Sequence, residues 1–442
     1  MSRRNLSVLF AALAIGLLCY SRADRNPYAR YTSRAFELID DLALEEPPDD
    51  ELFAGAVRGM VGVLRQRGDV HSGYLEPTSA EPLRAEMRQE FGGVGVRVGL
   101  EGDPPRVTVV EPPQPGTPAY ASPIRARDVI LSIDGFDTEG ADLATVVGHM
   151  RGPVGEPVEV AVRHADTTEE SFRLVREVIR VPSVIGDRRT AEGGWLFPLE
   201  EEPRVALVRL TTFGNRTTEE LERTLREAID SGVEAVVLDV RLNAGGALDT
   251  AIGVTGLFLP EGAAIVSTRG RGGRVVDRFA ATADGPFLDL PLAVLIDGDT
   301  ASASEIVAAA LQDHDRATVF GSRSFGKGTV QQLLSLEAGR SLLKLTAASY
   351  WRPSGVNIHR LPGTPDDEPW GVSPKSANAV SLTDEQRTAW FEWRRQRDLL
   401  AVEGAEPAEP PAPAPLEADT ILTRAVEHLL EGMESAQGDA AP

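Results

Sequence analysis

Two short segments of the chain hold residue types that can perform nucleophilic catalysis. The first runs from Asp299 to Glu305, between an apolar strand and a helix, and holds Ser302 among small neighbours. Backbone N–H groups at a helix N-terminus point outward and can bind a developing oxyanion. Serine is also favoured at this position as an ordinary helix cap. Taken by itself, the segment fits the cap better than the nucleophile.

The second segment, residues 321–331, carries Lys327 between two glycines. It nearly matches the phosphate-binding pattern GxxxxGK[ST], but residue 328 is glycine, so the hydroxyl that binds Mg²⁺ is missing. A lysine can instead act as a general base, because burial lowers the pKa of an amine from its ordinary value of about 10.4. A surface lysine fits the segment equally well. The chain has three lysines against 42 arginines, which favours a site that needs an amine able to lose its proton.

Two glycine-rich turns offer further backbone amides. The stretch Leu238–Gly246 ends a strand and turns tightly, so it fits a second oxyanion donor or an ordinary strand-to-helix connection. The glycines of residues 92–99 miss the GxGxxG spacing of dinucleotide sites. This loop can hold a peptide carboxylate and add the peptide to a sheet, although a plain glycine turn explains it slightly better.

The composition excludes several other functions. The net charge of −22 argues against nucleic acid as a partner, because phosphate binding needs a basic surface. The one cysteine, Cys19, lies in the apolar N-terminal stretch, so the folded part has no disulfide and no thiol nucleophile. The six histidines are scattered and form no zinc-binding pair. A zinc hydrolase and a cysteine-based metal site are therefore not expected.

The N-terminus has the pattern of an export signal. Arg3 and Arg4 precede an apolar run over residues 6–20, and Ser21 and Ala23 follow at the spacing of a cleavage site. The run is shorter than the ~20 residues of a membrane-spanning helix. We expect a cleaved signal peptide. The alternative is an uncleaved anchor that tethers the protein to a membrane through residues 5–20.

Three patterns of secondary structure surround these motifs. Apolar spacing predicts helices over residues 28–67. Short strands and Gly/Pro turns over residues 91–176 predict a β-rich module. Strands and helices alternate from residue 205, which predicts an α/β core, and structure is expected to fade past residue 394 into a flexible linker at 403–417 before a terminal helix at 420–430. The predicted strands are 107–110, 128–133, 157–163, 205–210, 235–240, 292–296, 318–321 and 342–348, and the predicted helices are 143–150, 217–231, 246–258 and 302–312.

Together these segments closely resemble the carboxy-terminal processing, or tail-specific, proteases of peptidase family S41 with a PDZ domain, over about residues 28–397. The matching motifs follow the order of the family along the chain. They are the PDZ-like stretch Gly92–Ile133, the turn Val237–Gly246, the nucleophile segment Thr300–Ile306 and the lysine segment Ser324–Gln331.

The resemblance implies a serine endopeptidase that uses a Ser-Lys dyad and neither metal nor cofactor. It assigns the nucleophile to Ser302, the general base to Lys327, the orientation of the lysine to Gln331, the oxyanion hole to Ala303 with Gly245 or Gly246, and peptide binding to Gly93, Val94, Gly95 and Val96. The family has proline where this chain has Ala244, which loosens the turn and leaves the choice between the two glycines open.

The resemblance also implies a fold and a setting. The expected fold is mixed α/β (α+β), with a crotonase-like core of stacked ββα units, an inserted β-rich PDZ domain and helical arms at both ends. Expected substrates are proteins with apolar C-termini, which the PDZ domain captures or gates. The expected location is the periplasm or cell envelope. Whether the protein forms a homo-oligomer or needs an adaptor is left open. The expected domains are the signal or anchor at 1–23, a helical region at 24–87, the PDZ domain at 88–176, the protease core at 177–397, and the linker with the terminal helix at 398–442.

A second interpretation is a non-catalytic envelope protein that binds peptides through the PDZ-like module, with the rest of the chain as a scaffold. The joint presence of Ser302, Lys327 and Gln331 argues against it, because a scaffold does not need all three. A P-loop NTPase ranks third because of the mismatch at Gly328.

Overall fold

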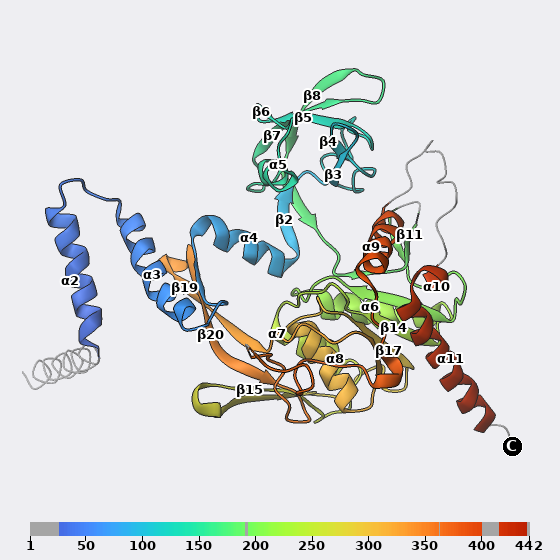
Figure 1. Ribbon diagram of the computed structural model, residues 1–442. Helices are drawn as coiled ribbons and strands as arrows, with labels where there is room; N and C mark the ends of the chain where they lie inside the picture. The colour runs from blue at the N-terminus through green and yellow to red at the C-terminus, as the bar shows by residue number, and fades with distance from the viewer. Residues whose placement is uncertain (1–25, 191–192, 362, 400–414, 440–442) are drawn as a thin grey trace, which may run out of the picture. The chain divides into compact units, whose positions relative to one another are not determined.

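The computed structural model describes residues 26–190, 193–361, 363–399 and 415–439 (Figure 1). The chain divides into two compact units: residues up to 77 with 333–345, and the remainder. The predicted export signal at residues 1–23 lies outside the described residues. Within the described part of the chain, no helix combines the length and apolarity needed to cross a bilayer.

Helices and strands are mixed through the described part of the chain, as expected. The helices are α2 (Pro27–Leu42), α3 (Asp49–Gln66), α4 (Pro77–Arg88), α5 (Leu143–Met150), α6 (Thr217–Asp230), α7 (Leu248–Gly256), α8 (Ala303–Asp313), α9 (Asp384–Asp398), α10 (Pro415–Ala418) and α11 (Thr420–Asp439). The first twelve strands are β1 (Gly73–Leu75), β2 (Glu90–Gly93), β3 (Val98–Glu101), β4 (Arg106–Val109), β5 (Val129–Ile133), β6 (Phe136–Asp137), β7 (Pro157–Arg163), β8 (Glu169–Val175), β9 (Glu177–Arg180), β10 (Val184–Ile185), β11 (Arg188–Arg189) and β12 (Trp195–Leu196). The remaining strands are β13 (Val205–Leu210), β14 (Ala235–Asp239), β15 (Ala264–Arg269), β16 (Val275–Ala280), β17 (Leu292–Ile296), β18 (Thr318–Gly321), β19 (Thr329–Leu336) and β20 (Ser341–Trp351).

In the first unit, α2 and α3 form where the apolar spacing predicts them. Asn26 caps α2 by accepting the N–H of Tyr28, and Pro27 occupies the first turn, where its missing N–H does no harm. No residue of α2 is buried, whereas α3 buries Val57 and Val61. Strand β1 pairs antiparallel with residues 342–344 of β20.

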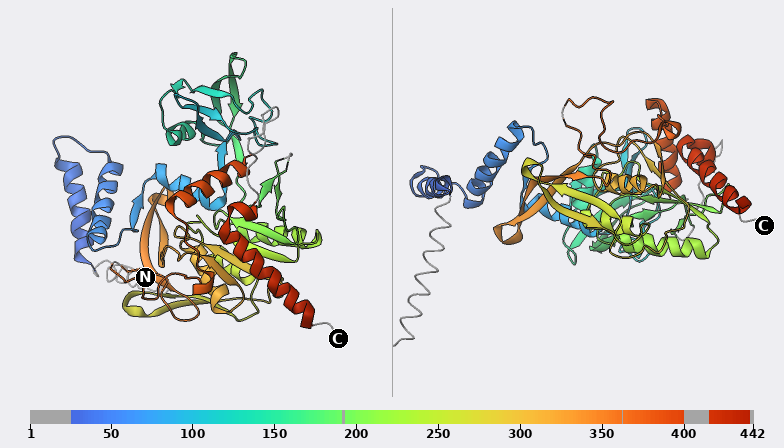
Figure 2. Two further views of the ribbon diagram at one scale, coloured as in Figure 1. Left: turned by 45° about the vertical axis from the view of Figure 1, so that its right-hand side comes forward. Right: turned by 90° about the horizontal axis from the view of Figure 1, so that it is seen from below.

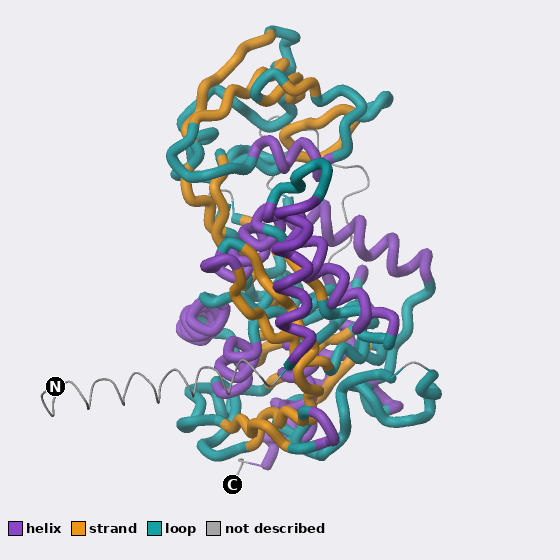
Figure 3. The backbone as a smooth tube through the Cα atoms, turned by 90° about the vertical axis from the view of Figure 1, so that its left-hand side faces the viewer, coloured by secondary structure: helices purple, strands orange, loops and turns teal. Residues whose placement is uncertain are grey.

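The β-rich module is an antiparallel sheet in the order β3-β4-β5-β7-β8, with α5 beside it. Figure 3 colours this part mostly as strand and loop. Val107, Ile130 and Val160 point from three strands into its own buried core. Strand β3 lies at the edge of the sheet, so its outer side is open to a further strand.

The α/β core is built on the sheet β10-β13-β14-β17-β18, whose last four strands are parallel. All five residues of β14 are buried, as expected for a central parallel strand covered on both faces. Val236 and Leu238 face a core cluster with residues of α6, α7 and α8, and Val237 faces a second cluster with residues of α11. The carboxyl ends of β14 and β17 lead into the turns that carry the candidate site.

The C-terminal part departs from the sequence prediction. Structure does not fade at residue 394, because α9 continues to Asp398, and residues 415–417 of the predicted linker already belong to α10. Proline is tolerated at the first position of a helix, and Leu416 packs against the core. Helix α11, red in Figure 2, packs Leu422 and Leu429 against the cluster that includes Val237. It is therefore part of the α/β core.

Candidate active site

Ser302 precedes the first residue of α8 and adopts an unusual backbone conformation. Its φ is 58° and its ψ is −116°. A helix cap normally has extended dihedrals, and a positive φ in a non-glycine residue costs of order 1–3 kcal/mol. Strain of this kind is found where a nucleophile is held on a sharp strand-to-helix turn. Ser302 also forms a capping box with Glu305, so it caps α8 in a strained conformation that an ordinary cap does not need.

A buried carboxylate, Glu305, joins Ser302 to Lys327. Glu305 is 0% exposed. Its Oε2 accepts the backbone N–H of Ser302 at 2.8 Å and the backbone N–H of Lys327 at 2.8 Å. The two nitrogens therefore lie no farther apart than twice that distance, although the residues are far apart in sequence. The structure thus brings together the two segments that the sequence motifs had singled out separately.

The second oxygen of Glu305 binds the rest of the lysine segment. Oε1 accepts the hydroxyl of Ser324 at 2.6 Å and the N–H of Gly326 at 2.8 Å. Burial raises the pKa of Glu305, and these donors oppose the shift because they favour the ionised carboxylate. No set of three or more side chains suited to a metal ion occurs among the described residues. Glu305 was given no role from the sequence, although Ser302-x-x-Glu305 matches the capping-box pattern and could have identified it.

Asn243 fixes the loop that follows β14, residues 240–246, which we call the oxyanion loop. Its side chain donates to the carbonyl of Leu210 at 2.7 Å and accepts the N–H of Gly245 at 2.8 Å. Its own carbonyl accepts the N–H of Ala301 at 3.0 Å and the hydroxyl of Ser304 at 2.9 Å. The oxyanion loop is thereby bound to the turn that carries Ser302. Asn243 was missed because three of its four partners, Leu210, Ala301 and Ser304, lie outside its own loop.

These contacts separate the two glycines between which the sequence could not choose. The N–H of Gly245 is already donated to Asn243. Among the hydrogen bonds of the described residues, none uses the N–H of Gly246 or of Ala303. A Cβ built on Gly245 would lie 2.9 Å from the nitrogen of Ala303, so the oxyanion loop passes directly against the first turn of α8. The unused N–H of Gly246 therefore distinguishes it from Gly245, whose N–H is donated to Asn243.

Replacement of Gly245 by alanine should inactivate the site. The new Cβ would lie 2.7 Å from the carbonyl oxygen of Ala301 and 2.8 Å from the Cβ of Ser302, at a φ of 103°. Backbone atoms must shift to relieve these contacts, and a misplacement of about 1 Å at a catalytic centre can cost roughly 100-fold in rate. Peptidase rates would measure the loss.

Gly232→Ala is the matched control for Gly245→Ala. Gly232 has a φ of 102°, and nothing lies within 4 Å of the position that an added Cβ would take. The variant therefore carries the backbone penalty of about 1 kcal/mol without the steric contacts. We expect Gly232→Ala to keep the wild-type rate. Equal rates for the two variants would contradict the steric argument.

Lys327 lies just before β19, and Gln331 is the third residue of that strand. The side-chain amide of Gln331 donates to the hydroxyls of Thr329 at 3.2 Å and Thr346 at 3.0 Å. Thr346 belongs to the neighbouring strand β20. These bonds fix the orientation of Gln331 on its strand. Its predicted role toward Lys327 stays a prediction.

The predicted peptide-binding residues form a loop between β2 and β3. The carbonyl of Val94 accepts the N–H of Ala119 at 2.9 Å, and that of Gly95 accepts the N–H of Gln114 at 3.0 Å. Where the structure describes hydrogen bonds, the N–H groups of Val94, Gly95 and Val96 take part in none. Gly93 ends β2, which pairs with β9. Val94 is buried, whereas Gly95 and Val96 are partly exposed just before the edge strand β3. The peptide-binding role of this loop stays a prediction.

Comparison with known proteins identifies the two modules. The sequence model of peptidase family S41 matches residues 204–369, and that of the PDZ domain matches residues 83–163. The chain is 37% identical over 369 residues to a carboxy-terminal-processing protease of Bartonella bacilliformis, covering 81% of this chain and 80% of the relative. It is 34% identical over 391 residues to a carboxyl-terminal-processing protease of Picosynechococcus sp., covering 84% of this chain and 89% of the relative.

Among solved structures, the photosystem II D1 C-terminal processing protease is similar with a TM-score of 0.44 and 28% identity, covering 81% of this chain and 93% of that one. The sequence matches carry the conclusion, because a relative more than 30% identical is matched over four fifths of its length. The resemblance found from the motifs is confirmed. The chain belongs to the carboxy-terminal-processing proteases of peptidase family S41 and carries a PDZ domain.

Proposed function

We propose that this protein is an exported serine endopeptidase that cuts proteins near apolar C-termini, with Ser302 as the nucleophile and Lys327 as the general base. One observation carries the proposal: a single buried carboxylate oxygen binds the backbone N–H groups of both residues at 2.8 Å. A scaffold has no reason to hold a strained serine and a lysine on one carboxylate. A peptidase does, because a general base must lie within reach of the nucleophile's proton.

The chemistry follows from the residue types. The neutral amine of Lys327 takes the proton of the Ser302 hydroxyl while its oxygen attacks the scissile carbonyl. The protonated lysine then gives that proton to the leaving amine, which leaves an acyl-enzyme. Water hydrolyses the acyl-enzyme by the same steps. Gln331 keeps Lys327 in the orientation needed for both proton transfers.

The negative oxygen of each tetrahedral intermediate needs hydrogen-bond donors. We assign this role to the N–H groups of Ala303 and Gly246, because Gly245 donates its own N–H to Asn243. Two preorganised amides facing the developing charge are the usual oxyanion arrangement. The helix N-terminus at Ala303 adds its positive dipole end.

The PDZ domain supplies the preference for C-termini in this proposal. The amides of Val94, Gly95 and Val96 bind the terminal carboxylate, with Gly93 leading into the loop, and the peptide extends along the edge strand β3 beside α5. Apolar side chains of the peptide are preferred because Val96 and Val98, which pack against the module's core, are only partly buried and offer apolar surface beside β3. Capture at this site delivers or gates the substrate.

Export and partners complete the proposal. The residue pattern of 1–23 supports export to the periplasm or cell envelope, with residues 5–20 as a membrane tether if the signal stays uncleaved. The relatives named above are carboxy-terminal-processing proteases, which supports protein substrates here. A homo-oligomer or an adaptor fits the proposal as well.

A non-catalytic peptide-binding protein is the second candidate. The edge strand β3 and the open amides of its loop favour it, because they suffice for capture without cleavage. The two candidates differ in what happens to a captured chain. A binding protein returns it intact, and a peptidase returns fragments.

The deciding experiment is digestion of an unfolded reporter protein with an apolar C-terminus, followed by mass spectrometry. We expect the wild type to cleave it and Ser302→Ala to lose roughly 10⁴-fold or more in rate while it still binds the reporter. Ser335→Ala, at an exposed serine, is the matched control and should stay active. Cleavage by Ser302→Ala at the wild-type rate would disprove the nucleophile, and capture without cleavage by the wild type would favour the binding protein.

A further inference from the structure

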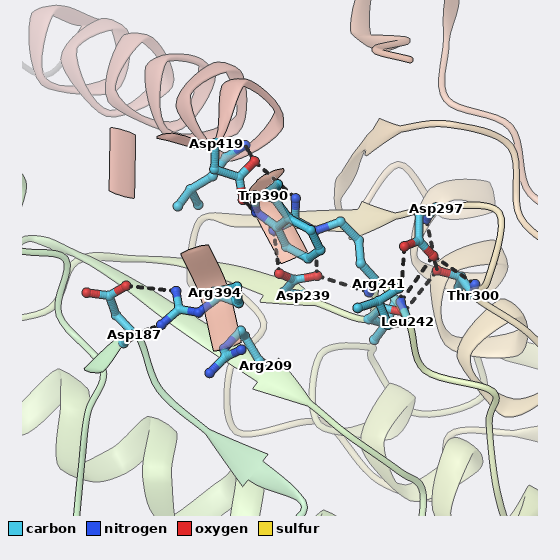
Figure 4. A network of polar contacts seen from close by, with 12 residues as sticks. Asp187, Arg209, Asp239, Arg241, Leu242, Asp297, Thr300, Trp390, Arg394 and Asp419 are labelled. Carbon is cyan, nitrogen blue, oxygen red and sulfur yellow. Dashed lines mark hydrogen bonds and ion pairs between the residues drawn. The ribbon is translucent and has the colours of Figure 1, made fainter. Parts of the chain in front are cut away.

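A buried ion pair connects the start of the terminal helix α11 to the oxyanion loop. Asp419 precedes α11, and its side chain is 3% exposed. Its Oδ1 accepts Nη1 of Arg241 at 3.0 Å, and its Oδ2 accepts Nη2 of Arg241 at 2.7 Å. Figure 4 shows the two side chains meeting between the sheet and the C-terminal helices. The residues are 178 positions apart in sequence.

Arg241 is also paired within its own loop. Asp239, at the end of β14, accepts Nε of Arg241 at 2.9 Å and Nη2 at 2.6 Å. Burial opposes the positive charge, but Asp239 and Asp419 outweigh it and raise the pKa of Arg241 above its ordinary value. Arg241 therefore stays charged and is shared by two carboxylates. Loss of the Asp419 charge would leave the Arg241–Asp239 pair in place.

Asp419 gathers donors from three elements. Besides Arg241, its Oδ2 accepts the indole N–H of Trp390 in α9 at 2.8 Å. Its Oδ1 accepts the N–H of Leu422 at 3.1 Å, which makes Asp419 the N-cap of α11. The guanidinium of Arg241 lies 4.5 Å from the centre of the Trp390 ring. Asp419 is therefore a junction of α9, α11 and the oxyanion loop.

The ion pair holds Arg241, and the residues on either side of Arg241 are held by the turn that carries Ser302. Leu242 has a φ of 57° and donates its N–H to Asp297 at 3.1 Å. Thr300 donates its hydroxyl to the carbonyl of Val240 at 2.9 Å. Arg241, between these two anchors, reaches in the other direction to α11. The path of the loop toward Gly246 thus depends on anchors on both sides.

We propose that Asp419 is a positioning residue of the peptidase: through Arg241 it fixes the oxyanion loop so that the N–H of Gly246 faces the reacting carbonyl oxygen. This inference rests on the proposed function, since it needs Gly246 as an oxyanion donor. It assigns the terminal helix a part in catalysis. Asp419 itself does not touch the substrate.

A role in stability alone explains the pair less well. Helix α11 already packs Leu422, Val426 and Leu429 into the core. Buried ion pairs contribute little net stability, because desolvation of both charges offsets their attraction. A fixed geometry at the loop is a better reason for a bidentate, fully buried pair, since a planar guanidinium sets direction as well as distance.

The test replaces Asp419 by asparagine. Asparagine keeps the size and can still cap Leu422, but its amide nitrogen would face the donors of Arg241 and Trp390 instead of accepting them. We expect kcat to fall about tenfold while KM changes less than twofold, because the oxyanion contact is made in the transition state. Inhibition by a peptide aldehyde, whose hemiacetal oxygen needs the same amide, should weaken about tenfold as well.

Two further variants separate positioning from folding. Leu429→Ala loosens the same helix without touching Arg241, and it should keep kcat at temperatures where the protein is folded. Arg241→Lys keeps the positive charge but cannot bridge two carboxylates with a planar fork, and it should lower kcat as Asp419→Asn does. The melting temperatures of all variants show over which temperatures each is folded, and kcat is compared only within that range.

The outcomes distinguish this inference from the proposed function. Cleavage by the wild type and none by Ser302→Ala supports the proposed function whatever the result for Asp419. A folded Asp419→Asn variant with wild-type kcat and aldehyde affinity would overturn the positioning role alone. A loss of kcat in Leu429→Ala equal to that in Asp419→Asn would also overturn it, because helix docking would then be the whole effect.

Discussion

Lys327→Arg should abolish peptidase activity even though it preserves the positive charge. Arginine keeps its proton at any pH that proteins tolerate, so it cannot accept the proton of Ser302. General-base catalysis contributes typically 10²–10⁴-fold, and we expect kcat/KM to fall by roughly 10³-fold. The reporter-cleavage assay measures the loss. The backbone contact should survive, because it is the N–H of Lys327, common to both residues, that binds Glu305.

Lys375→Arg is the control for Lys327→Arg, because Lys375 is one of only two other lysines in the chain. Lys375 is exposed and pairs with Asp315 at 3.4 Å, and its replacement by arginine leaves the charge and the surface pair intact. Lys375→Arg should cleave at the wild-type rate. Retained cleavage by Lys327→Arg would exclude the general-base role.

The sequence predicts the α/β core well because its elements are locally encoded. Strands 205–210, 292–296 and 318–321 of the core are found with the predicted ends, as is helix 143–150 of the β-rich module. Apolar runs bounded by turn residues specify such strands without knowledge of their neighbours. The helix α9 was missed because its mean composition is strongly polar, and only Trp390 and Trp393 bury apolar surface.

The candidate site likewise contains residues that local motifs identify and residues that only the fold brings together. Ser302, Lys327 and the glycines stand in short motifs, so the sequence singles them out. Asp419 does not, because an aspartate before a helix predicts only an N-cap. Its pairing with Arg241 depends on the packing of α11 across the sheet, which no local pattern encodes. Long-range contacts between buried charges are therefore the part of the site that only the structure reveals.

Glu305→Gln should strongly reduce activity although glutamine has nearly the same size and shape as glutamate. The glutamine has one oxygen where the carboxylate has two, so two of the four donors that Glu305 now accepts would face an NH₂ group. Each buried donor left without an acceptor costs about 1–3 kcal/mol. Whichever pair is lost, the link between Ser302 and the lysine segment is weakened. We expect a loss of roughly 10²-fold or more in kcat, consistent with displacement of catalytic groups by about 1 Å.

Glu220→Gln shows whether this loss is specific to the site. Glu220 is a nearly buried carboxylate on α6 that accepts the N–H of Ser183 at 2.9 Å and its hydroxyl at 2.8 Å. The donors from Ser183 all bind one oxygen of Glu220, which a glutamine can still supply, so its replacement should lower the free energy of unfolding by less than Glu305→Gln does and should not displace Ser302 or Lys327. Equal losses of kcat in the two variants would mean that Glu305 contributes stability alone. A loss confined to Glu305→Gln would show that one carboxylate sets the distance between the nucleophile turn and its base, which neither segment can set by itself.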